Sequence, residues 1–165
     1  MFDQYLIWFR DLPPALATLI IAMIPIAELR VSIPVALEVY HLSIPSAIFW
    51  SVLGDMIPAT LIIMFIDRLA AWGCRHSKRT EHFYQRMAKR TAKKFEKGYL
   101  KYGAAVALAL FVGVPLPMTG SWSGALAAFL FGIPKRVALP AILVGVCLAA
   151  GVVALAYLGL VKLFF

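Results

Sequence analysis

Apolar residues fill four long stretches of this chain, at residues 15–37, 44–66, 104–133 and 137–161. Each stretch is close to the roughly 20 residues that an α-helix needs to cross a bilayer. Apolar residues make up 62% of the 165 residues and charged residues 15%, against about 45–50% and about 25% in soluble domains. The pattern therefore predicts an all-α integral membrane protein that forms a single membrane domain over residues 1–165.

The first 14 residues have a different pattern. Apolar and aromatic residues recur there at helical spacing, at Phe2, Tyr5, Trp8, Phe9 and Leu12. This spacing predicts a short helix at the membrane interface over residues 1–14, anchored by its aromatic rings. The segment carries acids and lacks a basic start, so it is not a cleavable signal peptide.

Positive charge is concentrated in residues 67–101, which hold 11 of the 16 lysines and arginines and only three acids. By the positive-inside rule this segment is cytoplasmic, in an inner or plasma membrane. Apolar residues recur at helical spacing from Tyr84 to Tyr99 with basic residues around them, which predicts a basic amphipathic helix. The helix is either a binding surface for anionic lipid headgroups or a topology signal alone. Both ends are tethered to the membrane, so no nucleic-acid partner is expected.

The first and third stretches are each interrupted by proline and polar residues. The interrupting prolines and glycines, which we expect at the tips of hairpins, are Pro25, Pro34, Pro115, Pro117, Gly120 and Gly124. The apolar arms before the breaks have 10 and 11 residues, about 15–16 Å or half of a roughly 30 Å hydrocarbon core. Irregular backbone at that depth requires cover from protein or a water-filled cavity. The pattern predicts two re-entrant helical hairpins, with proline-kinked spanning helices as the alternative.

The chain also repeats itself. Each hairpin precedes a continuous segment that begins Ile-Pro, and Pro25 and Pro115, Pro45 and Pro134, and Gly54 and Gly145 correspond at offsets of 89 to 91 residues. We therefore expect two copies of one unit, at 15–66 and 102–165. With one true crossing per unit, the second copy is inverted, and Lys135 and Arg136 become cytoplasmic as the positive-inside rule requires.

Three charged residues fall near the expected midplane: Glu28, Arg30 and Asp55. A charge in the membrane costs at least about 2.5–3.5 kcal/mol, so it marks a function or a buried pair. We expect Glu28 and Asp55 to exchange protons, with a buried ion pair to Arg30 that only holds the hairpin as the alternative.

The second arms of the hairpins are predicted to start at Ser32–Pro34 and Thr119–Ser123, where helix starts carry partial positive charge. With Arg30, the residues expected to bind an anionic or amphipathic substrate are Ser32, Thr119, Ser121 and Trp122. Close helix packing is an alternative role for Gly120 and Gly124, and interior packing for Trp122.

Enzymatic activity is not expected. No histidine falls at membrane depth to activate a serine, Asp55 has no second aspartate motif, and no phosphate-binding loop is present. Cys74 and Cys147 lack metal-ligand spacing, so neither a metal nor a cofactor is expected.

Two motifs together resemble the family of small multidrug export proteins: Glu28-Leu-Arg30-x-x-Ile-Pro34 and Pro115-Leu-Pro117-x-Thr119-Gly120-x-Trp122-x-Gly124. That family is similar in turn to the wider DedA group. The resemblance implies two inverted re-entrant hairpins, each packed with a transmembrane helix, and proton-dependent lipid flipping or transport. It also implies roles for membrane-embedded acids and arginines, matched here by Glu28, Arg30 and Asp55.

The leading functional prediction is a proton-coupled transporter of an anionic or amphipathic small molecule or lipid. The alternatives are an energy-independent lipid scramblase or flippase and a membrane scaffold that transports nothing. Two crossings per chain are too few to enclose a pathway, so a homodimer is expected.

Overall fold

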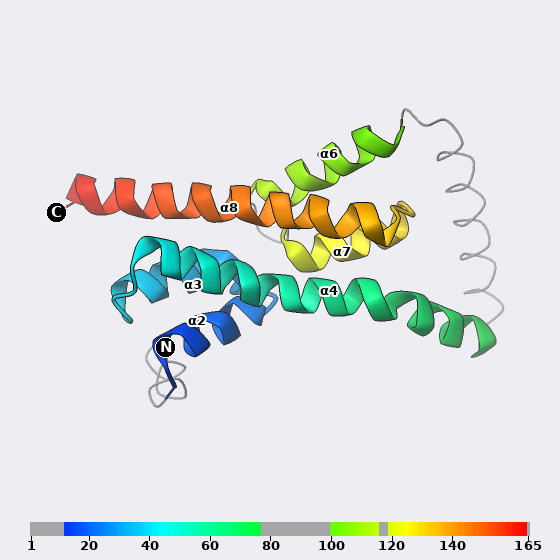
Figure 1. Cartoon of the computed structure of the whole chain (residues 1–165), viewed down its shortest axis with the longest axis horizontal. Coiled ribbons are helices and arrows are strands. Elements are labelled where there is room, and N and C mark those ends of the chain that lie inside the picture. Colours follow the sequence, from blue (N-terminus) through cyan, green and yellow to red (C-terminus); the bar gives the residue numbers. More distant parts are fainter. Residues whose placement is uncertain (1–11, 77–99, 116–118, 165) are drawn as a thin grey trace. The chain divides into compact units, whose positions relative to one another are not determined.

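The computed structural model describes residues 12–76, 100–115 and 119–164, and these ranges are helical, without strands (Figure 1). This result confirms the all-α prediction. The predicted interfacial helix and the amphipathic part of the basic segment lie largely outside the described residues. The helices are α2 (Pro14–Met23), α3 (Glu28–Glu38), α4 (Ile44–His76), α6 (Leu100–Gly113), α7 (Ser121–Leu130) and α8 (Lys135–Phe164).

Two helices, α4 and α8, are much longer than the others, with 33 and 30 residues. Their segments Ile44–Arg68 and Lys135–Gly159 are long and apolar enough to cross a membrane. The sequence pattern placed the end of the second apolar stretch at residue 66, but α4 continues to His76. The residues after Asp67 include Arg, Leu and two Ala, which are strong helix formers, so the change from apolar to polar sequence does not end the helix.

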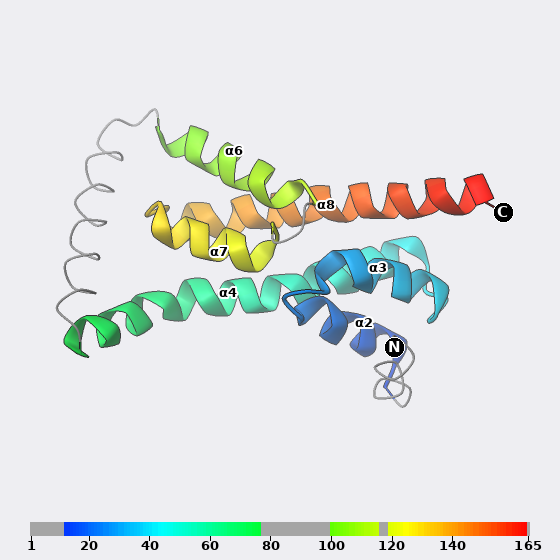
Figure 2. The ribbon, with the colours of Figure 1, turned by 180° about the vertical axis from the view of Figure 1, so that it is seen from behind.

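The first broken stretch forms a helical hairpin of α2 and α3, which pack against each other (Figures 1 and 2). A spanning helix with a proline kink would not bring its two halves into such contact. The turn at Ile24–Ala27 contains Pro25, and the Ile24 carbonyl accepts hydrogen bonds from the N–H groups of Ala27 and Glu28 at 3.1 and 3.0 Å.

The second arm of this hairpin begins at Glu28, so its predicted start at Ser32–Pro34 is wrong. Pro34 lies inside α3 and not at the tip of the hairpin. The hydrogen bonds of the Ile24 carbonyl start the helix earlier than the polar residues suggest. A proline inside the helix then removes only one backbone N–H, which membrane helices tolerate.

The second broken stretch also forms a hairpin, in which α6 and α7 pack against each other. Pro115 lies in the connection between the two helices, and Pro117 lies outside the described residues. Because α7 begins at Ser121 with Gly120 as its N-cap, the predicted start at Thr119–Ser123 is confirmed. A β-carbon at Gly124 would lie 2.5 Å from Val112 Cγ2, so Gly124 allows the two arms to pack closely.

The contacts of the chain divide it into two compact units. The first comprises Met1–Met56 and Ala149–Phe165, and the second comprises Ile57–Leu148. Each unit therefore contains one hairpin and a part of each long helix. Buried apolar side chains form the core of each unit, including Ile21, Ile33 and Ala47 in the first and Val112, Ala128 and Ile142 in the second.

The same close contact between a long helix and a hairpin occurs in both units. In the first, a β-carbon at Gly54 of α4 would overlap the carbonyl oxygen of Leu19 and lie 2.9 Å from Ala22 Cβ. In the second, a β-carbon at Gly145 of α8 would lie 2.6 Å from the carbonyl oxygen of Ala109 and 2.7 Å from Val112 Cβ. Only glycine allows backbones to approach this closely without a shift.

Candidate functional site

A buried hydrogen bond between two serines joins α3 to α4 in the first unit. Ser32 Oγ donates to Ser51 Oγ at 2.9 Å, and both side chains have no exposed surface. Hydroxyl groups in an apolar interior require such partners, because a buried polar group without one is costly. The pair joins the two helices at this level.

Each serine has an acid one helical turn away on its own helix. Glu28 precedes Ser32 by four residues on α3, and Asp55 follows Ser51 by four residues on α4. Side chains at i and i+4 lie on the same face of a helix. All four are buried, with Glu28 exposing 8% and Asp55 1% of its surface. The structure thus collects four polar side chains along one line of contact, which we call the α3–α4 polar stripe: Glu28, Ser32, Ser51 and Asp55.

The two acids lie at the same end of this stripe. The chain returns from α3 to α4 through a connection of five residues, so the helices run in opposite directions (Figures 1 and 2). One turn back along α3 and one turn forward along α4 are therefore steps in the same direction from the serine pair. Glu28 and Asp55 consequently lie near the turn of the hairpin.

The backbone at Glu28 is strained. Its φ of 44° is in the left-handed region, which residues with a β-carbon rarely adopt. The residue opens α3, where a carboxylate interacts favourably with the helix dipole, and its carboxylate also interacts with the charge of Arg30. Strained backbone at a buried acid is typical of functional sites, where other contacts hold the conformation.

Polar residues just before and within the start of α7 form hydrogen bonds inside the second hairpin. The Gly120 N–H donates to Ser123 Oγ at 2.9 Å, and Thr119 Oγ1 donates to the Val114 carbonyl at 2.8 Å. The first of these bonds is half of a capping box and starts α7. Ser121 is fully buried at the first position of the helix.

The indole N–H of Trp122 is a buried donor at the start of α7. Its Nε1 is buried and has no acceptor among the residues that the structure describes. A buried polar group of this kind calls for an explanation, such as a ligand or a water molecule.

The predicted site residues thus fall in both units. Glu28, Arg30, Ser32 and Asp55 belong to the first, and the tip from Thr119 to Trp122 belongs to the second. The structure brings Glu28, Ser32 and Asp55 together on the polar stripe. The joining of the two tips into one substrate site stays a prediction.

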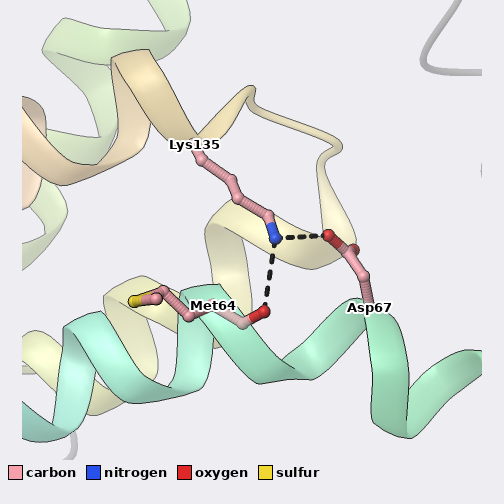
Figure 3. Close-up of polar contacts among 3 residues, drawn as sticks. All are labelled: Met64, Asp67 and Lys135. Carbon is pink, nitrogen blue, oxygen red and sulfur yellow. Dashed lines mark hydrogen bonds and ion pairs between the residues drawn. The ribbon is translucent and has the colours of Figure 1, made fainter.

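Sequence reasoning missed Ser51, the residue that links the two helices of the stripe. The available signal was its position four residues before Asp55, on the same face of a helix that is otherwise apolar. Sequence reasoning also missed a contact further along α4 (Figure 3). There Lys135 Nζ lies 2.7 Å from the Asp67 carboxylate and 3.4 Å from the Met64 carbonyl oxygen.

The two long apolar helices and the paired short ones define a helical membrane protein. The sequence profile of the small multi-drug export protein family matches residues 28–152, more than half of the chain. The chain belongs to this family. The match begins at Glu28 and covers the polar stripe and the second hairpin. Neither the curated proteins nor the solved structures contain a match to the chain.

Proposed function

We propose that this chain is a proton-coupled membrane exporter in which Glu28 and Asp55 exchange protons. The observation that carries the proposal is the burial of two carboxyl groups in an apolar helical unit, at the turn of the first hairpin. The family name supplies export as the general activity. An acid that can gain and lose its charge inside an apolar unit is suited to couple a proton to movement of a substrate.

The ion pair at the start of α8 supports a re-entrant second hairpin. Lys135 opens the apolar segment of α8, and Asp67 lies at the end of that of α4, so their contact supports a topology with these two ends on one side of the membrane. The intervening chain then crosses an even number of times. With 14 and 10 residues, α6 and α7 are about 21 and 15 Å long and do not each cross a core of roughly 30 Å.

The same arrangement satisfies the positive-inside rule. Residues 67–101 and the pair Lys135 and Arg136 all come to the cytoplasmic side, and α6–α7 enters and leaves from there. The first hairpin precedes the start of α4, which is the end of its apolar segment opposite to Asp67. In this topology the first hairpin enters the membrane from the side opposite to the cytoplasm. Its helices α2 and α3 have 10 and 11 residues, about 15–17 Å.

The glycine contacts support a duplication of one unit. Gly54 meets Leu19 and Ala22, and Gly145 meets Ala109 and Val112, so each contact of the first copy recurs 90 or 91 residues later. The charges do not recur, because Val146 occupies the place of Asp55. We infer that the first copy carries the proton chemistry and that the second contributes a substrate surface with Thr119, Ser121 and Trp122.

The substrate is proposed to be an anionic or amphipathic small molecule or lipid. Arg30 supplies a positive charge beside Glu28, and the half-buried Trp122 supplies an apolar surface with a free indole N–H among the described residues. The positive charge of Arg30 would attract an anionic group of the substrate. Two copies of the chain would line the pathway.

Reconstitution into liposomes tests the proposal. Translocation of a fluorescent phospholipid and of an amphipathic anionic dye is measured with and without a proton gradient, for the wild type and for Glu28→Gln and Asp55→Asn. Matched controls are Glu38→Gln, an exposed acid on the same helix as Glu28, and Asp67→Asn, a half-exposed acid on the same helix as Asp55. We expect gradient-driven flux that both buried-acid variants abolish and both controls retain.

The other functions predict different outcomes. Flux that is the same with and without the gradient, and insensitive to both buried-acid substitutions, would establish a scramblase. No flux of either probe would favour a scaffold. Either result would overturn the proton-coupled mechanism.

A further inference from the structure

One face of α4 changes from apolar to basic and aromatic where its membrane-spanning segment ends. Four exposed residues at helical spacing share this face, which we call the Arg68 face: Leu61, Phe65, Arg68 and Trp72. Leu61 and Phe65 each expose 48% of their surface, and Trp72 exposes 64%. The apolar segment of α4 is Ile44–Arg68, so this face runs from the lipid tails to the headgroups.

The Arg68 guanidinium has an aromatic partner and, among the described residues, no acidic one. Its Cζ lies 5.7 Å from the centroid of the Phe65 ring, close enough for a cation–π interaction. The neighbouring acid, Asp67, pairs instead with Lys135 at 2.7 Å (Figure 3). The charge of Arg68 is therefore left for an anion from outside the chain, and the ring already restricts the side chain that such an anion would have to order.

The depth of these residues matches the layers of a bilayer. Leu61 lies seven residues before Arg68, about 10 Å further into the hydrocarbon core for a helix along the membrane normal. Trp72 lies four residues after Arg68, about 6 Å beyond the boundary, and the headgroup layer on each side of the core is about 5–8 Å thick. Tryptophan is favoured at this level, because its ring is apolar and its N–H is polar.

We propose that the Arg68 face binds one anionic phospholipid, with an acyl chain on its apolar part and the headgroup at Arg68 and Trp72. Arginine forms paired hydrogen bonds with two phosphate oxygens. A zwitterionic phosphatidylcholine brings its own positive charge, which the guanidinium repels, whereas phosphatidylglycerol brings none. This lipid site is independent of the proposed export function, because it shares no residue with the proposed proton and substrate sites.

The other end of the apolar segment provides a comparison within the same helix. There Phe49 and Trp50 form an edge-to-face pair with ring centroids 5.3 Å apart, and no lysine or arginine occurs between Leu42 and Ile57. Aromatic rings alone suit the membrane interface but do not select the charge of a lipid. The preference for an anionic lipid should therefore be confined to the Arg68 end of α4.

Fluorescence quenching in vesicles tests the proposal. The full chain is reconstituted into phosphatidylcholine vesicles with Trp72 as its single tryptophan, through Trp8→Phe, Trp50→Phe and Trp122→Phe. Rising fractions of phosphatidylglycerol or phosphatidylcholine carry a nitroxide near the top of one acyl chain, and the nitroxide quenches a nearby indole. Because one arginine near the membrane surface contributes about a fivefold preference for anionic lipid, phosphatidylglycerol should quench Trp72 at a correspondingly lower fraction than phosphatidylcholine does. Circular dichroism identifies the proteins that fold, and where the three substitutions prevent folding, the Trp72 signal is the difference between the full chain and Trp72→Phe.

Arg68→Gln should remove this preference, and Arg68→Lys, which keeps the charge, should retain most of it. Arg136→Gln is the matched control, because Arg136 is an exposed arginine at the start of the other long helix with no aromatic residue within two turns of it on α8. It should keep the preference at Trp72. A chain with Trp50 as its single tryptophan should show no preference.

Three results would overturn the lipid site. Equal losses in Arg68→Gln and Arg136→Gln, or an equal preference at Trp50, would indicate diffuse attraction to the net charge of +8. Equal quenching of Trp72 by the two lipids would show that no preference exists. A preference that survives in a folded Arg68→Gln protein would exclude Arg68 as the group that selects the headgroup.

Discussion

Substitution of Gly145 by alanine tests how closely α8 packs against the second hairpin. The new β-carbon would lie 2.6 Å from the carbonyl oxygen of Ala109 and 2.7 Å from Val112 Cβ. The first distance is roughly 0.7 Å short of the ordinary C···O approach of about 3.3 Å. Because the oxygen belongs to the backbone of α6, no side-chain rotation relieves the overlap, and α6 must move.

The expected cost follows from two opposing terms. Overpacking of a well-packed interior costs about 1–3 kcal/mol, while replacing glycine by alanine in a helix gains about 0.8–1 kcal/mol. Gly151→Ala on the same helix receives only the gain, because nothing lies within 4 Å of its added β-carbon. The difference in the free energy of unfolding between the two variants therefore measures the overlap alone. Gly145→Ala should be less stable than Gly151→Ala by about 1–3 kcal/mol.

Unfolding in mixed micelles by titration with sodium dodecyl sulfate, followed by helical circular dichroism, measures this difference. A loss of 1 kcal/mol also corresponds to a fall of about 2–4 °C in Tm for a chain of this size. Gly54→Ala should lose a similar amount, since its β-carbon meets the equivalent carbonyl of Leu19. A Gly145→Ala protein as stable as Gly151→Ala would refute the close contact of α8 with α6.

Three further tests concern the backbone at Glu28 and two side-chain contacts. The Glu28→Gly protein should be more stable than the Glu28→Ala protein by about 1 kcal/mol, because only glycine adopts a φ of 44° without strain. Equal stability of the two variants in the same micelle assay would contradict the left-handed backbone. A double-mutant cycle of Asp67→Asn and Lys135→Gln should give a coupling free energy below about 1 kcal/mol that weakens with salt, because both side chains are nearly half exposed. A coupling free energy that does not change with salt would exclude a surface ion pair. Tyr157→Phe should lower the free energy of unfolding by less than about 1 kcal/mol, and it should cause no further loss in a protein that already carries Glu38→Gln. Additive losses from the two substitutions would show that the two side chains do not interact.

The family assignment and the resemblance agree on the same residues. The motifs that carry the resemblance, from Glu28 to Pro34 and from Pro115 to Gly124, both lie inside the matched range 28–152. One of these motif residues, Gly124, has a structural role that the contacts explain directly, because Val112 leaves no room for a β-carbon. Glu28 is buried, and its strained backbone is unfavourable for folding.

The sequence by itself determined the helical class, the two long apolar helices and the places where the other two stretches break. These features depend on hydrophobic length and on proline and polar residues, which act over one or two turns of chain. The start of α7 was predictable for the same reason, since Gly120 and Ser123 form a local cap. The start of α3 was not predictable in this way, because hydrogen bonds to the Ile24 carbonyl begin that helix at Glu28, before Ser32 and Pro34.

Only the tertiary structure decided which polar side chains meet. Ser32 and Ser51 are 19 residues apart and belong to different helices, so their hydrogen bond depends on the register in which α3 packs on α4. That register depends on how the hairpin of α2 and α3 packs against α4, and Gly54 lets the backbone of α4 approach Leu19 of α2 closely. Helical periodicity alone places Glu28 near Ser32 and Ser51 near Asp55, but the packing of one helix against the other turns these two separate pairs into one buried stripe.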